Sequence, residues 1–116
     1  MVSSYKDLVV WQRSVELALS IYRLTAAFPK DERFSLTSQV QRAGVSIPSN
    51  IAEGYGRGTR KEYKHFLAIA RGSTLEVQTQ LIIANELGYC DADALKRTES
   101  LSEEVSKMLY SLIQKL

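Results

Sequence analysis

Residues 59–87 read TRKEYKHFLAIARGSTLEVQTQLIIANEL and carry the longest helical pattern in the chain. The stretch begins with Thr59-x-x-Glu62, a capping-box pattern that satisfies unpaired amides of a first helical turn. It ends before Gly88, and Gly72 inside it costs a helix about 1 kcal/mol relative to Ala. One seam of apolar and small residues recurs at i+3 and i+4 spacing: Tyr63, Phe66, Ala70, Thr74, Val77, Leu81, Ala84 and Leu87. The pattern predicts one long helix over this stretch.

This predicted helix also carries apolar residues outside its main seam. They are Ile69, Leu75, Ile82 and Ile83. A helix that is apolar on several faces has more surface to bury than one packed against a single core. We expect it to contact more than its partners within one small bundle.

A second predicted helix runs from about residue 7 to Phe28, where Pro29 ends it because the residue before a proline disfavours the α region. It carries two adjacent apolar stripes, together about twice as wide as the ~100° that a core-facing helix needs. The stripes are Leu8, Trp11, Val15, Ala18 and Tyr22, and Val10, Leu17, Ile21, Leu24 and Phe28. The remaining face of this helix is predicted to be a narrow polar strip, formed by Gln12, Arg13, Glu16, Ser20 and Arg23.

The helix between these two is predicted to begin near Ser35 or Thr37 and to end near Glu53, with Gly54 as the residue after its cap. Pro48 lies inside it and is expected to kink it. Gly44, four residues earlier, makes that kink less costly because it has no β-carbon.

A last helix is predicted to be capped by Asp91 or Asp93 and to run to the end of the chain. The side chains it buries are expected to be Leu95, Leu101, Val105, Met108, Leu112 and Leu116. The short turns make successive helices antiparallel neighbours. The prediction is an all-α, up-down four-helix bundle with a Pro-kinked second helix, as a single domain over residues 1–116.

The composition is that of an ordinary globular domain, with 45% hydrophobic and 24% charged residues. Cys90 is the sole cysteine, which excludes an internal disulfide and a multi-cysteine zinc site within one chain. The first residues show no signal-peptide pattern, and the apolar run 81–84 is far shorter than the ~20 residues of a membrane span. We therefore expect a cytoplasmic protein.

Positive charge gathers between Gly54 and Gly72, where five basic residues face one acidic residue within a chain of net charge +2. Four of these basic residues lie in the turn and at the start of the helix that follows: Arg57, Arg60, Lys61 and Lys64. Cations are unfavourable at a helix N-terminus, so their presence there favours a polyanion partner. The alternative is a solvated charged turn. We predict a nucleic-acid contact, with Arg42, Tyr55, His65 and Arg71 as further candidates.

A polar group occupies positions where burial is expected. Its members are Arg42, Ser46, Asn50 and Glu53 on the second helix, and Arg71, Ser73 and Glu76 on the third. Glu53 falls at a helix C-terminus, where an anion needs a cationic partner such as Arg71 or Arg57. We interpret Asn50, Glu53, Ser73 and Glu76 as a structural polar network or a subunit contact, and not as an active site.

Catalytic patterns are weak. Glu62-x-x-His65 resembles half of a di-iron motif, but the chain has one His and cannot supply the second half. His65 is better explained as a solvated side chain or a phosphate contact. A hydrolytic triad is equally unsupported. We expect no enzyme activity, no cofactor and no metal.

Three stretches resemble a known family: Leu36–Ala43, the run Ser46-Ile-Pro-Ser-Asn-Ile-Ala-Glu-Gly54, and Ala70-Arg-Gly-Ser-Thr-Leu-Glu76. They are similar to the four-helix bundle proteins encoded within intervening sequences of bacterial 23S ribosomal RNA genes, also labelled S23 ribosomal protein-like. Leu8–Trp11 and Phe28-Pro29 fit the same pattern.

The resemblance implies an up-down bundle that assembles as a homopentamer, with no catalytic residues to carry over. A related branch, the accessory proteins of diversity-generating retroelements, binds nucleic acid and a reverse transcriptase. The resemblance therefore implies structured RNA or DNA as a partner, or a reverse transcriptase or ribosome-associated factor. A protein-interaction scaffold that does not touch nucleic acid is the alternative.

Overall fold

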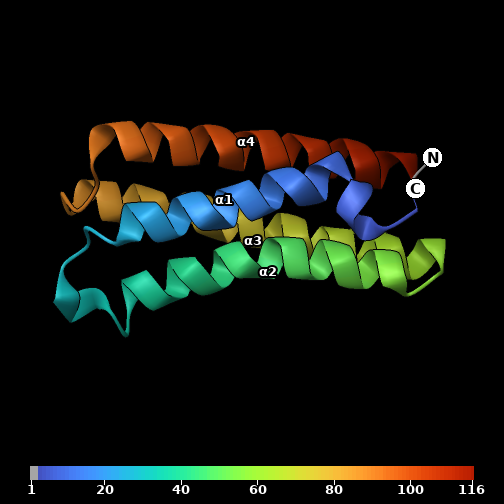
Figure 1. Cartoon of the computed structure of the whole chain (residues 1–116), viewed down its shortest axis with the longest axis horizontal. Coiled ribbons are helices and arrows are strands. Elements are labelled where there is room, and N and C mark those ends of the chain that lie inside the picture. Colours follow the sequence, from blue (N-terminus) through green and yellow to red (C-terminus); the bar gives the residue numbers. More distant parts are fainter. Residues whose placement is uncertain (1–2) are drawn as a thin grey trace.

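The computed structural model describes residues 3–116, and four long helices make up this part of the chain. The helices are α1 (Val9–Thr25), α2 (Leu36–Gly56), α3 (Arg60–Glu86) and α4 (Ala92–Lys115), with short 3-10 turns η1 (Tyr5–Asp7) and η2 (Lys30–Glu32). They run antiparallel along a body of 43 × 24 × 21 Å (Figure 1). α1 packs between α2 and α4, and α3 packs between the same two neighbours on the opposite side. The predicted up-down bundle is confirmed.

Side-chain caps begin α3 and α4 at predicted residues, although the capping box at Thr59 forms only in part, because the Glu62 carboxylate contacts the Thr59 hydroxyl and Arg57. The Glu62 amide donates to Thr59 Oγ1 at 3.2 Å, and the Ala94 amide donates to Asp91 Oδ2 at 3.0 Å. At the other end of α3, Gly88 takes a positive φ of 77°. Its amide donates to Asn85 O and that of Tyr89 to Ala84 O, which is a Schellman motif.

The core lies along the bundle axis and follows the predicted seams in part. Its fully buried large side chains come from all four helices: Leu17, Ile21, Leu24, Val40, Ile47, Ile51, Leu67, Val77, Leu81, Val105 and Leu109. Leu67 and Leu109 are fully buried although they lie outside those seams. On α4 the predicted core residues that are only partly buried are Leu101, Met108, Leu112 and Leu116. Two predicted core residues are wrong, since Tyr22 is 48% and Leu87 is 54% exposed. Tyr22 lies at the outer edge of its stripe, and Leu87 lies beyond the last turn of α3.

The polar strip predicted on α1 is also wrong at one position. Ser20 is buried, and its hydroxyl shares a 2.7 Å hydrogen bond with that of Thr98 on α4. Ser14 and Ser102 are buried as well. Ser20 pairs with a hydroxyl of α4, and Ser14 donates to Trp11 O, so hydrogen bonds allow these small polar side chains to lie in the interior.

Gly54 does not end α2, contrary to the prediction. The helix continues to Gly56, and Gly58 takes the positive φ of 85° in the turn that follows. A β-carbon on Gly54 would lie 2.6 Å from Phe66 Cβ, so this glycine is required where α2 approaches α3. At Gly44 a β-carbon would lie 2.6 Å from Ile21 Cδ1, the end of a side chain that can shift, so the demand for glycine is weaker there.

The second helix passes through Pro48 without interruption. Its ribbon changes direction near the middle in Figure 1, as expected for a helix that lacks one backbone donor. Pro48 itself is buried among core residues of α2.

Two outer edges of α3 remain uncovered, as the surplus of apolar residues predicted. Along the α4 side lie Leu75 and Ile82, which is 59% exposed. Along the α2 side lie Ile69 and Ile83, because they follow the helical spacing of Ser73, whose hydroxyl bonds Ser46 of α2. We call Ile69, Ile83 and Leu87 the α2-side apolar edge.

Glu32 connects two turns that are distant in sequence. Its carboxylate accepts a hydrogen bond from Tyr89 Oη at 2.8 Å and others from the Leu36 amide and the Ser35 hydroxyl. These bonds cap α2 and fix the α3–α4 turn. They favour the ionised form, so the hydrogen bond from Ser35, with those from Tyr89 and Leu36, lowers the pKa of Glu32 below its ordinary value.

The α2–α3 contact predicts opposite effects for two glycines. Gly54→Ala forces a methyl group against Phe66 and is expected to reduce the free energy of unfolding by about 1–3 kcal/mol. Gly72→Ala is the matched control, because a β-carbon there meets nothing within 4 Å and should stabilise α3 by up to about 1 kcal/mol. Urea unfolding measures both. Equal effects of the two substitutions would contradict the close approach at Gly54.

The hydrogen bonds to the Glu32 carboxylate predict that the protein loses stability as the pH falls. A carboxyl whose folded pKa is lowered contributes fully above its unfolded value of about 4.5, and loses that contribution as the pH falls through the folded pKa. Glu32→Gln should therefore have a lower melting temperature than the wild type at pH 7. The difference in melting temperature should shrink below about pH 4.5. Thermal unfolding across this range, with Glu86→Gln as control, measures the effect. A difference that is constant with pH would contradict it.

Candidate nucleic-acid interface

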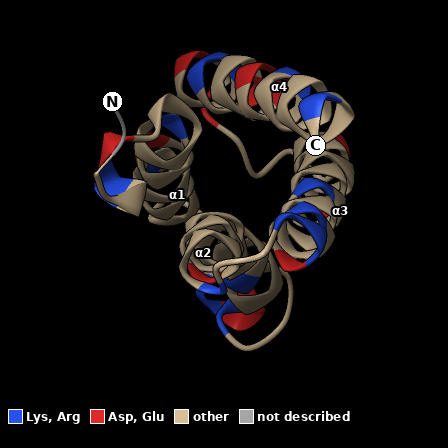
Figure 2. Ribbon diagram, turned by 90° about the vertical axis from the view of Figure 1, so that its right-hand side faces the viewer, with Lys and Arg blue, Asp and Glu red and all other residues tan. Residues whose placement is uncertain are grey.

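The basic residues predicted to bind nucleic acid lie at one end of the bundle. The turn over residues 57–59 brings α3 back along α2, and Thr59 caps its first turn. Arg60, Lys61 and Lys64 occupy the first two turns of α3 and are exposed. The end of the bundle that holds this turn faces the viewer in Figure 2.

Arg57 differs from its three basic neighbours because two carboxylates already bind it. Its Nη2 lies 2.6 Å from Glu53 Oε2, and its Nη1 lies 3.7 Å from Glu62 Oε1. The hydrogen bond to Glu53 raises the pKa of Arg57 above its usual value. Its guanidinium also stacks on the Phe66 ring at 4.9 Å. Arg57 therefore stabilises the turn. It is one of the two partners that the sequence predicted for Glu53.

The other three cations have no such partner. Within residues 3–116, the ion pairs closer than 4.0 Å involve only Arg13 and Arg57 among the basic side chains. Arg60, Lys61 and Lys64 thus present their charge to solvent. They also stand at the positive end of the α3 dipole. An anionic ligand there would offset both the unfavourable interaction of the cations with the dipole and their repulsion of one another.

Charge is unevenly divided along the bundle axis. The half nearest the α2–α3 turn is made of residues 3–17, 46–73 and 104–116, and it holds nine Lys or Arg against five Asp or Glu. The opposite half holds six against eight. Lys6 and Lys115, which lie near the two ends of the sequence, both belong to the basic half. Sequence reasoning missed them because only the antiparallel topology brings them to this end.

Two further candidates near the turn are aromatic. The Tyr55 ring packs edge-on against Tyr63 at 5.9 Å and is half-buried. His65 is exposed, with its ring edge-on to Phe66 at 5.4 Å. His65 therefore lies beside the cations, whereas Tyr55 chiefly joins α2 to α3.

Arg42 and Arg71 lie away from the basic turn. Arg42 is exposed on α2, in the acidic half of the bundle. Arg71 lies on the α4 side of α3, with its guanidinium 5.1 Å from the centre of the Tyr110 ring. The prediction that Arg71 could pair with Glu53 is wrong, because Arg57 occupies that carboxylate.

The polar network predicted between α2 and α3 forms only in part. Ser46 and Ser73 share a hydrogen bond of 2.9 Å, and Asn50 Nδ2 donates to Ser46 O and Oγ. Glu53 instead pairs with Arg57, and Glu76 accepts a 3.4 Å bond from Gln80. The network is a structural link between two helices, flanked by the α2-side apolar edge.

Residues 3–116 contain neither a cluster of metal-ligating side chains nor a membrane-spanning helix. No three His, Cys, Asp or Glu side chains lie close enough to hold a metal ion, so Glu62 and His65 gain no further ligand there. None of the described helices is both long and apolar enough to span a membrane.

Comparison with known proteins agrees with the fold and with the sequence motifs. Residues 6–111 match the family of 23S rRNA-intervening sequence proteins. The chain is also similar to a solved protein of unknown function from the S23 ribosomal protein family of Bacteroides thetaiotaomicron VPI-5482, at 27% identity and a TM-score of 0.81. The similarity covers 90% of this chain and 98% of that one. A comparison with curated proteins finds no match.

Proposed function

The chain belongs to the 23S rRNA-intervening sequence protein family, and on that premise we propose that it is a non-enzymatic, homopentameric module that binds structured RNA or DNA. The observation that carries the proposal is the basic turn, where Arg60, Lys61 and Lys64 are exposed and unpaired at a helix N-terminus. Such a surface attracts phosphates without reading bases.

The geometry of the turn favours contact with a phosphate backbone. The three cations follow one another along less than two turns of α3, so they can reach neighbouring phosphates of one strand. Arg57 forms ion pairs with Glu53 and Glu62, so it stabilises the turn and contributes little charge to a bound phosphate. His65 stands on the same helix and can add a contact.

Assembly would strengthen this field. Five chains of net charge +2 carry +10 together. The pentamer is the assembly implied by the resemblance to this family, and the α2-side apolar edge supplies a surface for it. Ile83 there is 46% exposed, and Leu87 beside it is 54% exposed, which is unusual for large apolar side chains on one helix edge.

A second candidate function is a protein-interaction scaffold that binds a reverse transcriptase or a ribosome-associated factor. The same apolar edge favours it, because an uncovered apolar surface fits any protein partner of complementary shape. The two functions differ in salt dependence, since counterion release accompanies phosphate binding and not apolar docking.

Neutralising the basic turn tests the proposed function. The triple variant Arg60→Gln, Lys61→Gln, Lys64→Gln should weaken binding to a labelled RNA hairpin. It should also flatten the log–log salt slope by about 0.9 for each duplex phosphate contact that is lost. Fluorescence anisotropy over a salt series measures both quantities.

The matched control for the triple variant is Lys96→Gln with Arg97→Gln, which removes exposed charge from the opposite half of the bundle. This double variant should retain the wild-type slope. A wild-type affinity that does not change with salt would contradict nucleic-acid binding and favour the scaffold.

A charge on the α2-side apolar edge tests the assembly. Ile83→Glu places a carboxylate where we expect a second copy to pack, and it should shift the protein toward a 13.0 kDa monomer in light scattering. Ser100→Glu, at an exposed position of α4, should leave the oligomer intact. An unchanged mass for Ile83→Glu would exclude this edge as the subunit interface.

A further inference from the structure

Arg71 is a basic side chain fixed between α3 and α4 with no anionic partner. Within residues 3–116 it makes no ion pair, and its Nε is buried without a hydrogen bond. The Tyr110 ring holds the guanidinium from one side. A partly desolvated cation without a partner is costly, so this site favours binding of an anion.

The surface around Arg71 is a hollow that contains hydrogen-bond donors and no acid. Its volume is about 470 Å³, and its lining residues are Arg71, Ser106, Lys107, Tyr110 and Ser111. We call it the Arg71 hollow. Two cations and three hydroxyl groups there can all donate to one ligand.

Both serines have free hydroxyl groups. Serines within helices often donate to a carbonyl of their own helix, as Ser49 does to Val45 O at 2.9 Å. In the described part of the chain, the hydroxyls of Ser106 and Ser111 make no such bond to any protein atom. They therefore remain available to a ligand.

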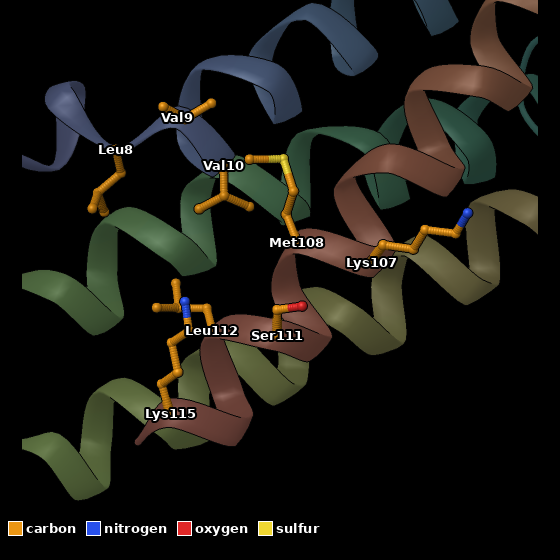
Figure 3. Close-up of a pocket in the computed structure, with 8 residues that line it drawn as sticks. All are labelled: Leu8, Val9, Val10, Lys107, Met108, Ser111, Leu112 and Lys115. Atoms are coloured by element: carbon orange, nitrogen blue, oxygen red, sulfur yellow. The ribbon is translucent and has the colours of Figure 1, made fainter.

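Lys107 and Ser111 also line a second hollow, between the start of α1 and the end of α4. Figure 3 shows both side chains directed away from the apolar side chains of Leu8, Val10 and Met108 in that hollow. Their polar atoms thus leave the apolar groove, which agrees with a role in the Arg71 hollow.

An apolar hollow of about 310 Å³ adjoins the first on the other side of Arg71 and Tyr110. Apart from those two residues and Gln114, its walls are Ala68, Gly72, Leu75 and Ile113. An anion site lies beside an apolar hollow that contains the Tyr110 ring. This arrangement fits a ligand in which a phosphate is joined to a flat organic group.

We propose that the Arg71 hollow binds the phosphate of a nucleotide, whose base lies in the adjacent apolar hollow. The Arg71 guanidinium offers a planar fork to two phosphate oxygens, and Lys107 adds a second positive charge. Ser106 and Ser111 donate to the remaining oxygens. The site is separate from the basic turn and goes beyond the proposed function, since it accepts a free nucleotide as well as one unit of a strand.

Calorimetric titration of the full chain with uridine monophosphate tests the site. We expect saturable binding of one nucleotide per chain. Arg71→Gln should weaken it at least ten-fold. Ser106→Ala with Ser111→Ala should also weaken it, although this variant keeps every charge, which separates a built site from general attraction. Arg97→Gln, an exposed charge elsewhere on α4, should bind as the wild type does.

A second arm uses an eight-nucleotide single-stranded RNA to distinguish the source of the phosphate. Loss of both ligands in Arg71→Gln assigns the hollow to a strand, and loss of the mononucleotide alone assigns it to a free nucleotide. The triple variant of the basic turn should still bind the mononucleotide, so failure of the proposed function would leave this site intact. Unsaturable binding to the wild type, or equal binding by wild type and both site variants, would overturn the proposal.

Discussion

α3 has more apolar surface than its two neighbours can cover, and the rest of the molecule is arranged around that constraint. α2 covers one side through the close approach of Gly54 to Phe66, and α4 covers the other. Leu75 and Ile82 remain exposed on one edge, and Ile69 and Ile83 on the other. Full burial of such a side chain contributes about 1.5–3 kcal/mol, so a surface that covered one edge would be stabilised considerably. We infer that another copy of the chain covers the α2-side edge.

The two ends of the bundle have different electrostatic character, and the chain order produces this difference. The antiparallel topology places the α2–α3 turn, the start of α1 and the end of α4 at one end, where cations are in excess. Because Arg57 is neutralised locally by Glu53 and Glu62, the charge available to a ligand comes from the side chains that follow it on α3. Sideways assembly through α3 would leave this end accessible and place several copies of it together.

Periodicity predicted the helices and the uncovered faces of α3, and capping residues predicted where α3 and α4 begin, with Asp91 or Asp93 left open for α4. Each of these features depends on residues close in sequence. Prediction from sequence failed where the reason lies in another helix. Gly54 has the sequence context of a helix end, yet its role is to admit Phe66, and Ser20 has the polarity of a surface residue, yet it bonds Thr98. For the candidate site, the sequence located the basic turn and named Arg57 as one of two possible partners of Glu53, but it could not decide between Arg57 and Arg71. The link from Glu32 to Tyr89, 57 residues away, had no sequence signal at all.

Sedimentation velocity on the unmodified chain tests the central claim most directly, because covering the α2-side edge by another copy requires a defined assembly. A single species of about five times 13.0 kDa, unchanged on moderate dilution, is the predicted result. A 13.0 kDa particle at every concentration would contradict the claim, since the apolar edge of α3 would then be exposed in the working protein.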